Sequence, residues 1–436
     1  MISYEKYKAS SCDWIDSIPS HWDTHRVKML FSLRDERNYK PLNEVNLISL
    51  YTSLGVRQHK DIEHTTGNKA RNADGYKIVH PDDMVVNILL CWMGAIGRSD
   101  YYGVTSPAYD IYKPKTKSVN TKYYNYLMRT PMFAQQCYRA GKGIMAMRWR
   151  TYSPQFSNIV VPVPSRDEQD QIVRFLDWKV SGINKLIQAK QKQLSYVQQV
   201  VNKQFEIVSK KSLQKAKLKY HVCLLNDFIE LENNEYYKKT GMYNRGRGIF
   251  RRNEILGSDM GDSKFQRIHA GCVMISGQFA WEAATYVTTN EDEQGVASHR
   301  YYLLKPKDNI PPEYIWCFLM SDYGQMLMKL CSHGAAGRNR PLNIKELLNT
   351  YFPIPQNSDE LNLLVKNVQG LMMLRKNILE QINTLKELRN RLISDVVTGK
   401  IDVRGVEIPE YEYVNEDMTD TDEEAENEEL TEEQEE

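Results

Sequence analysis

Two stretches of the chain carry an apolar residue at every seventh position. The first contains Val173, Val180, Ile187, Leu194, Val201 and Val208, and the second contains Leu364, Leu371, Ile378, Leu385 and Leu392. Equivalent positions of the two stretches lie 191 residues apart. A seven-residue apolar repeat over four or more heptads is typical of a coiled coil. The pattern therefore predicts two long helices, separated by a domain-sized interval, that can pair with each other.

The segments before the two helices repeat one order of patterns. Residues 43–115 contain β-branched and aromatic runs broken by Gly, Pro, Asn and Asp, which predicts strands. Residues 120–139 have a helical pattern, and a last strand ends at Pro164. The second half contains equivalents of these landmarks at offsets of 189 to 191 residues. We therefore predict two copies of a globular unit, each followed by a long helix.

The predicted fold class is α+β, with two repeated mixed α/β domains separated by two long helices that form an antiparallel intramolecular coiled coil. The predicted boundaries are an N-terminal arm over 1–24, a first globular unit over 25–164, the central helix over 165–212, a second globular unit over 213–356, the distal helix over 357–400 and a C-terminal extension with an acidic disordered tail over 401–436.

The expected helix ends have local signals. The capping pattern Ser165-x-x-Glu168 begins the first helix, and Gly399 is a C-cap candidate for the second.

Arg375 and Arg389 lie where a second core stripe is expected. Heptad helices are often oligomerisation elements, but a domain-length tether favours pairing within the chain. Each helix of roughly 40 residues would be about 60 Å long and would place the two globular units at opposite ends of a rod.

The net charge of +1 conceals an uneven distribution. From Asn415 to Glu436 there are 13 acidic residues and no Lys or Arg, which leaves +14 on residues 1–414. A basic body suits a polyanionic partner such as nucleic acid, although basicity alone does not decide the partner. The tail contains no aromatic residue, and its composition predicts disorder.

The sequence contains no recognisable catalytic or cofactor motif. A GxxxxGK[ST] loop, an HExxH motif and the Asn/Asp-Pro-Pro-Tyr/Phe tetrapeptide of amino-methyltransferases are all absent. The seven cysteines are scattered and never in CxxC spacing, which argues against a zinc knuckle and for a reducing compartment. Asp82 and Asp83 could imitate a nuclease cluster, but a turn before a strand is the simpler interpretation. With neither a signal peptide nor a long apolar run, we expect a cytoplasmic protein without a membrane partner.

Basic residues in Gly-containing loops are the candidates for contacts with double-stranded DNA. Arg and Lys bind phosphate, while Arg and Asn can also read base edges. Any one of them could be a solvated surface charge, but YNRGRGIFRR and GAAGRNRPLN interleave charge with Gly. The candidates are Arg57, His59, Lys60, Lys69, Arg71, Lys142, Arg148 and Arg150 in the first unit, and Lys238, Lys239, Arg245, Arg247, Arg251, Arg252, His333, Arg338, Asn339 and Arg340 in the second.

Four stretches together resemble the specificity (S) subunit of type I restriction–modification systems. They are YKASSCDWIDSIPSHWDTHRVK, VPVPSRDEQDQIVRFLDWK, FPIPQNSDELNLLV and LKELRNRLISDVVTGKIDVRG. The resemblance covers essentially residues 1–414. It implies two target-recognition domains, each reading one half of a bipartite, asymmetric DNA site, and two helices that fix the gap between the halves.

The same resemblance implies that this chain is non-catalytic. It implies that two methyltransferase (modification) subunits dock on the helices and that restriction–translocase subunits join them. S-adenosylmethionine, ATP and Mg would belong to those partners, with no cofactor or metal in this chain. The second junction departs from the first, since Asp359-Glu360 stands where the first has Glu168-Gln169. Two alternatives stay open: a self-contained DNA methyltransferase or nuclease, and a coiled-coil scaffold without a DNA role.

Overall fold

Contacts divide the protein into two units. Among the described residues, unit 1 holds those within Met1–Gln188 and from Thr384 onward, and unit 2 holds those within Ala189–Asn383. The computed structural model describes residues 3–52, 54–61, 72–143, 149–210, 214–244, 246, 248–261, 263–307, 309–334, 340–355 and 357–415.

Unit 1 begins with an arm that contains the antiparallel strands β1 (Tyr7–Ala9) and β2 (Ser17–Pro19). Its globular part, residues 23–163, is called head 1. Head 1 contains β3 (Asp23–Arg26), α1 (Val27–Leu30), β4 (Phe31–Arg34), η1 (Leu42–Glu44), β5 (Ile48–Tyr51), β6 (Gly55–Gln58), η2 (His59–Asp61), β7 (Lys77–Val79), β8 (Met84–Asn87), η3 (Cys91–Met93), β9 (Ile96–Arg98), β10 (Gly103–Thr105), β11 (Tyr109–Pro114), α2 (Thr121–Met128), α3 (Pro131–Ala140), α4 (Ser153–Phe156) and β12 (Val160–Val163).

The globular part of unit 2, residues 215–353, is called head 2. Head 2 contains β13 (Lys215–Lys217), α6 (Leu218–His221), β14 (Val222–Leu225), β15 (Phe228–Ile229), β16 (Tyr236–Met242), β17 (Ile249–Leu256), η5 (Gly257–Asp259), β18 (Phe265–Arg267), β19 (Val273–Ser276), η6 (Ala280–Glu282), β20 (Thr285–Val287), η7 (Asn290–Gln294), β21 (Val296–Ser298), β22 (Tyr301–Pro306), α7 (Pro312–Met320), α8 (Asp322–Leu330), α9 (Ile344–Leu348) and β23 (Tyr351–Pro353).

Both heads are built on a four-stranded antiparallel sheet with one strand order, which is β4-β11-β8-β9 in head 1 and β14-β22-β19-β20 in head 2. Equivalent strands begin 189 to 192 residues apart. Every residue of β8 and of β19 is buried, which explains why these strands read as continuous apolar runs rather than as alternating ones. The internal repeat inferred from the sequence is therefore present in the fold.

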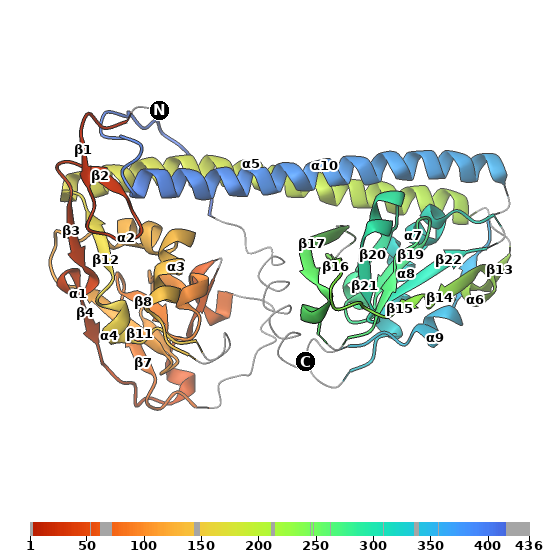
Figure 1. Ribbon diagram of the computed structural model, residues 1–436, viewed down its shortest axis with the longest axis horizontal. Helices are drawn as coiled ribbons and strands as arrows, with labels where there is room; N and C mark the ends of the chain where they lie inside the picture. Colours follow the sequence, from red (N-terminus) through yellow and green to blue (C-terminus); the bar gives the residue numbers. More distant parts are fainter. Residues whose placement is uncertain are drawn as a thin grey trace. The chain divides into compact units, whose positions relative to one another are not determined.

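The heads differ in the strands added to this sheet. In head 1, β5 and β6 form a separate two-stranded hairpin. In head 2, the longer hairpin β16–β17 continues into a five-stranded sheet with the order β15-β18-β21-β16-β17. Head 2 therefore has a more extended β arm at the same place in the chain (Figure 1).

The segment expected to form one helix over 120–139 forms two. Asn120 caps α2 by accepting hydrogen bonds from the amides of Lys122 and Tyr123. Thr130 caps α3, whose first residue is Pro131. The break occurs because proline is disfavoured within a helix but suits its first position.

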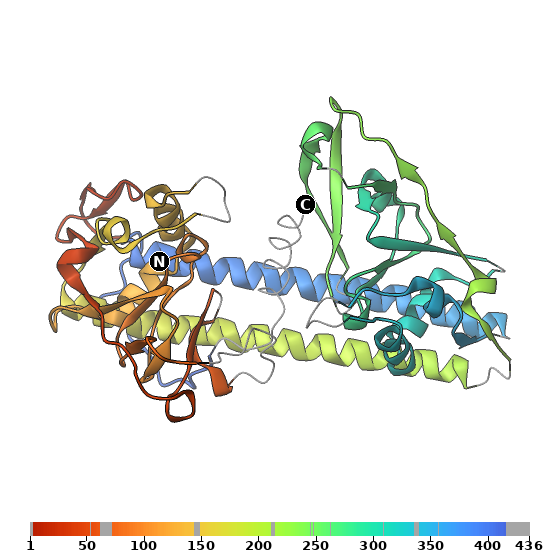
Figure 2. The same ribbon diagram turned by 90° about the horizontal axis from the view of Figure 1, so that it is seen from below.

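The two long helices are α5 (Arg166–Ser209) and α10 (Ser358–Val397), which lie side by side (Figures 1 and 2). In unit 2, Arg375 donates to the Gln198 amide oxygen at 3.2 Å, and Asn367 donates to Gln204 at 3.2 Å. In unit 1, Arg389 donates to Asn184 at 3.0 Å. Residue numbers rise on α5 as they fall on α10, so the predicted antiparallel pairing is confirmed.

The heptad positions form the apolar seam of this pair. Each predicted seam residue is buried or half-buried, from Val173 to Val201 on α5 and from Leu364 to Leu392 on α10. Arg375 and Arg389 occupy a second, polar stripe and reach across to amide side chains of the other helix. Such polar pairs favour one register of the two helices, because a slipped alignment would leave a guanidinium beside apolar groups.

The ends of the helices follow the sequence signals. The Ser165 hydroxyl accepts from the Glu168 amide at 3.4 Å. The Glu168 carboxylate does not return this bond; it accepts from Tyr4 at 2.7 Å and lies 2.8 Å from His21. Gly399 follows α10 with a φ of 79°, and a Cβ there would overlap Pro19. The N-terminal arm therefore packs against both the start of α5 and the end of α10.

Candidate nucleic-acid interface in each head

In head 2, the tip of the β16–β17 hairpin (residues 243–248) is held against the turn η6. The Gly246 amide donates to the Ala283 carbonyl at 2.8 Å, and the Asn244 side chain donates to the Glu282 carboxylate. Gly246 has a φ of 60°, and a Cβ there would lie 2.8 Å from the Met320 methyl group. Glycine is therefore required both by the left-handed backbone and by the close approach of the helix α7.

The loop between α8 and α9 (residues 331–343) reaches the same turn. A backbone bridge between Ser332 and Leu342 closes its base, and the Leu342 amide donates to the Gly277 carbonyl at 2.7 Å. The Arg340 guanidinium lies 5.4 Å from the centre of the Trp281 ring in η6. The turn η6 thus joins the two basic stretches that the sequence singled out in the second unit.

The remaining described candidates of head 2 are engaged by other groups. Arg251 lies 2.7 Å from Asp292, Lys238 lies 3.3 Å from Glu254, and His333 lies 2.7 Å from Glu346. The Lys239 ammonium lies 5.8 Å from the Phe265 ring. Arg252 is half-buried in β17. Arg245, Arg247, Arg338 and Asn339 lie outside the described residues.

Head 1 repeats the hairpin contact with different chemistry. Arg129, the residue after α2, donates to the Thr52 carbonyl at 3.1 Å. A Cβ at Gly55, whose φ is 70°, would lie 2.7 Å from the Arg129 guanidinium. Gly55 precedes Gly246 by 191 residues, and Arg129 precedes Met320 by the same interval. Each hairpin tip is therefore held by the residue at the end of the following helix.

The loop between α3 and α4 of head 1 (residues 141–152) is the equivalent of the α8–α9 loop. A backbone bridge between Lys142 and Arg150 closes its base. Trp149 stacks on Tyr138 with ring centres 4.7 Å apart, and Tyr138 lies 5.9 Å from the Trp92 ring in η3. The Trp149 indole also donates to the Tyr138 carbonyl at 2.9 Å. Aromatic stacking therefore holds the base of this loop to η3.

The other candidates of head 1 lie around the hairpin. Arg57 is half-buried on β6 and donates to the Val56 carbonyl at 3.0 Å, while His59 and Lys60 follow in η2. Lys60 and Lys142 are exposed. Lys69, Arg71 and Arg148 lie outside the described residues.

Trp92 and Trp281 were not among the candidates derived from the sequence. They lie 189 residues apart, which is the offset of β8 from β19 and of β9 from β20. The repeat of the sequence places a tryptophan at both positions. The candidates for DNA contact were chosen by positive charge, however, and an indole side chain is uncharged. Trp281 lies where two loops of head 2 meet, and Trp92 lies beside the base of one loop of head 1. Both places become visible only in the fold.

The protonation of two side chains near the candidate interface depends on burial and on neighbouring charges. Burial raises the pKa of Tyr286, which lies beneath the hairpin tip of head 2, to about 12, and neighbouring Asp292 adds to this effect. The phenol therefore stays neutral and adds no negative charge. In head 1, burial opposes ionisation of Asp82, but the Arg98 guanidinium prevails and holds the pKa of that carboxyl below its usual range.

Asp82 and Asp83 form the turn that the sequence predicted and not a metal cluster. Asp82 has a φ of 69° directly before β8, and Asp83 lies 2.8 Å from Arg34. Across the described ranges, no group of three or more His, Cys, Asp or Glu side chains is arranged to hold a metal ion. Within the same ranges, no helix is both long and apolar enough to cross a membrane.

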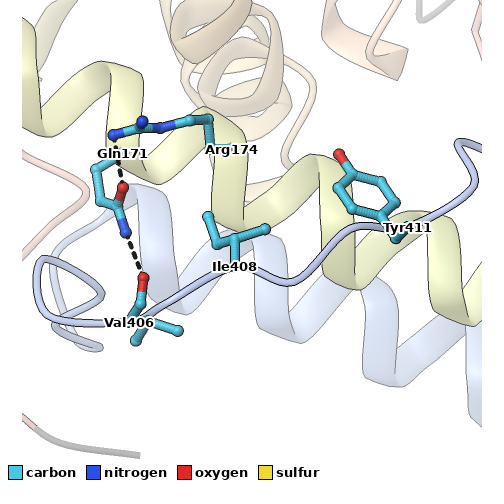
Figure 3. Close-up of a pocket in the computed structure, with 5 residues that line it drawn as sticks. All are labelled: Gln171, Arg174, Val406, Ile408 and Tyr411. Atoms are coloured by element: carbon cyan, nitrogen blue, oxygen red, sulfur yellow. Dashed lines mark hydrogen bonds between the residues drawn. The ribbon is translucent and has the colours of Figure 1, made fainter.

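A second surface lies on the first turns of α5 in unit 1. The C-terminal segment follows α5, since the Gln171 amide donates to the Val406 carbonyl at 2.9 Å and Ser181 donates to Glu412 at 2.9 Å. Gln171, Arg174, Val406, Ile408 and Tyr411 line a cavity of about 350 Å³ (Figure 3). A neighbouring depression is acidic and contains Asp167, Asp170 and Asp177. Burial raises the pKa of the Asp177 carboxyl above its ordinary value.

The long helices also expose apolar side chains away from their seam. In unit 2, Tyr196, Val200 and Ile207 are exposed on α5, and Leu363 and Leu374 are exposed on α10. Spacings of 4, 7 and 11 residues place each set on one helix face. These five residues are called the exposed apolar stripe.

Comparisons with known proteins identify the class of fold. Protein-family models give no match to the sequence, and a search of curated proteins gives none either. Solved structures do match, and these belong to type I restriction–modification (R-M) systems. A chain from a study of the complex assembly and conformational transition of the type I R-M system is 12% identical, covers 88% of this chain and 99% of its own length, and has a TM-score of 0.52.

Two further structures carry the name of the subunit. The HsdS subunit from Thermoanaerobacter tengcongensis is 12% identical over 89% of this chain and 98% of its own, with a TM-score of 0.34. The type I S subunit from M. genitalium is 12% identical over 89% and 97%, with a TM-score of 0.39. The resemblance read from the sequence motifs is thus confirmed at the level of the fold, which the TM-score of the first chain carries.

Proposed function

We propose that this chain is the non-catalytic DNA-recognition subunit of a type I restriction–modification complex. In this proposal each head reads one half of a bipartite, asymmetric site. The helix pair sets the gap between the halves and carries two adenine-methyltransferase subunits, which restriction–translocase subunits join. S-adenosylmethionine, ATP and Mg belong to those partners, and the complex works in the cytoplasm.

The observation that carries the proposal is the way one turn fixes basic loops. In head 2 two such loops meet at η6, and in head 1 the α3–α4 loop is held to η3. In head 2, η6 contacts both the hairpin tip at Gly246 and the α8–α9 loop at Arg340. In head 1, Trp92 of η3 contacts Tyr138, on which Trp149 stacks. A rigid turn that fixes two Gly-containing basic loops can present Arg and Lys to phosphates and, at fixed positions, to base edges.

The chemistry of methylation requires a partner. An enzyme that modifies a base must extrude it from the duplex into a pocket. Two hollows lie on α5. One is an open depression lined by three aspartates together with Lys122 and Arg174, and the other is a cavity beside it. We therefore assign base flipping and methyl transfer to the partner subunit rather than to these hollows.

The exposed apolar stripe on the helices is the proposed dock for a modification subunit. Val200→Asp should strongly reduce co-purification of that subunit, because it places a charge in an apolar contact. Gln199→Asp, at an exposed position one residue away, is the matched control. Equal binding by both variants would exclude this face of α5.

The test of the main proposal uses the complex reconstituted with two modification subunits and a pool of random duplexes. We expect enrichment of one sequence with two specific halves and a fixed gap, and a steep loss of affinity with salt. If neither enrichment nor salt dependence is seen, the chain is a scaffold without a DNA role. If the purified chain alone transfers methyl groups from S-adenosylmethionine to DNA, it is an enzyme and the proposal is wrong.

A further inference from the structure

Arg340 differs from three other candidate cations of head 2 in what holds it. Arg251, Lys238 and His333 each have a carboxylate within 3.3 Å. Arg340 is exposed, and within the described ranges its guanidinium has neither a carboxylate nor a hydrogen-bond acceptor as a partner. Its neighbour is the Trp281 ring, 5.4 Å away. No carboxylate among the described residues of head 2 therefore neutralises the positive charge of Arg340.

Trp281 is itself fixed. Its indole nitrogen donates to the Gln278 carbonyl at 3.1 Å. The turn that carries it ends at Ala283, which has a φ of 58° and receives the Gly246 amide. The ring is thus tied to Gln278, and the turn that carries it is tied to the hairpin tip. A ring held in this way attracts a guanidinium and restricts its rotamers without occupying its N–H donors.

We propose that Arg340 is a DNA contact of head 2 and that Trp281 is the residue that positions it. The inference rests on the proposed function and adds the residue that acts in one half-site. The ligand chemistry is a pair of acceptor oxygens or nitrogens, supplied either by the O6 and N7 edge of a guanine or by a backbone phosphate. The cation–π contact orients the guanidinium before DNA arrives, so less rotamer freedom is lost on binding.

Head 1 has a different arrangement at the equivalent position. The residue 191 positions before Arg340 is Trp149, whose ring stacks on Tyr138 and whose indole nitrogen donates to a carbonyl of head 1. The equivalent position in head 1 therefore stabilises the loop and offers no donor of its own. The proposal accordingly assigns Arg340 to one half of the site and leaves the other half to different residues.

The experiment uses the reconstituted complex and the duplex that the wild-type complex enriches. Arg340→Ala, Trp281→Ala, Trp281→Phe and Lys307→Ala are compared, the last being an exposed cation of head 2 outside the interface. We expect Arg340→Ala to weaken binding about tenfold. A loss of preference at one base pair of one half-site would identify the guanine edge, and a uniform loss with a salt slope reduced by about 1 would identify phosphate.

Trp281→Ala should reproduce a smaller part of the Arg340→Ala defect in the same half-site, and Trp281→Phe should restore most of it because the ring face returns. Thermal unfolding of each variant checks that head 2 is folded. An unchanged affinity of Arg340→Ala, or an equal loss in Lys307→Ala, would overturn the inference while the enriched bipartite site still supports the proposed function. If the wild-type complex enriches no sequence, the proposed function itself fails and Arg340 loses its role with it.

Discussion

The two heads share a scaffold and differ in the side chains that join its loops. Both hold a hairpin-tip glycine at the end of a helix, but Arg129 does so in head 1 and Met320 in head 2. Both anchor a basic loop on a tryptophan, but through Tyr138 and Trp149 in head 1 and through Arg340 in head 2. The two heads therefore share the positions at which their loops are anchored, but not the side chains at those positions. Under the proposed function, two heads of this kind would read two unlike half-sites.

The largest expected difference lies in the cores. Trp316 is buried in α7 of head 2, and the residue 191 positions earlier is Asn125, which accepts from the Arg98 amide at 2.9 Å. Trp316→Ala should lower the free energy of unfolding of unit 2 by about 3–5 kcal/mol, since it leaves a cavity. Asn125→Ala should cost unit 1 only about 1 kcal/mol, the net value of one hydrogen bond. Urea denaturation combined with limited proteolysis would report both, and equal losses would contradict the comparison.

The hairpin tips give the next largest effect. Gly246→Ala should destabilise head 2 by about 1–3 kcal/mol, because the backbone is left-handed and Met320 is buried against it. Gly55→Ala should cost less, since the half-buried Arg129 can swing aside. Gly370→Ala, at an exposed position of α10 with no neighbour near its Cβ, should instead stabilise by about 0.5–1 kcal/mol. Thermal melts of the three variants would test this order, and a greater loss for Gly55→Ala would reverse it.

The polar stripe of the helix pair should show a smaller contrast. Arg375 is buried in unit 2, so Gln198→Ala removes an acceptor that cannot be replaced by water and should cost about 1–2 kcal/mol. Asn184→Ala should cost about half as much in unit 1, because Arg389 is less buried. Denaturant midpoints would be compared with those of Gln199→Ala, an exposed position on the same helix. An unchanged Gln198→Ala midpoint would mean that the pair adds no stability.

The smallest expected effect is on the salt dependence of DNA binding. Lys142 of head 1 is exposed, whereas Lys238 of head 2 lies 3.3 Å from Glu254. Lys142→Ala should lower the slope of log affinity against log salt by about 1, and Lys238→Ala by less, since its charge is already compensated. Fluorescence anisotropy over a salt series with the reconstituted complex would measure both slopes. Lys203→Ala on α5 should leave the slope unchanged.

Much of the architecture was predictable because it depends on local periodicity. The heptad residues from Val173 to Leu392 indicated the two helices, and the constant offset indicated the repeated heads. The antiparallel pairing followed from the return of the chain after a closed domain. The break at Thr130–Pro131 was missed because apolar spacing continues across it.

The candidate interface was less predictable because its state depends on distant residues. Arg251 pairs with Asp292, which lies 41 residues away in the chain. Trp281 and Arg340 are 59 residues apart and meet only in the fold. Composition identifies which loops are basic, but it cannot tell which charges are already neutralised by a carboxylate. The fold makes that distinction: Arg251 has a carboxylate partner, and Arg340 has none among the described residues.

The way unit 1 is assembled has a consequence for how the protein is made. Arg404 lies 4.9 Å from the Tyr4 ring, and Tyr123 donates to the Val397 carbonyl at 2.9 Å. Unit 1 therefore needs residues that lie on both sides of unit 2 in the chain, whereas the described part of unit 2 comes from the single interval Ala189–Asn383. Head 2 can complete its core while synthesis continues, but head 1 must wait for the end of α10. A nascent chain truncated before residue 384 would then have its second head finished and its first still open.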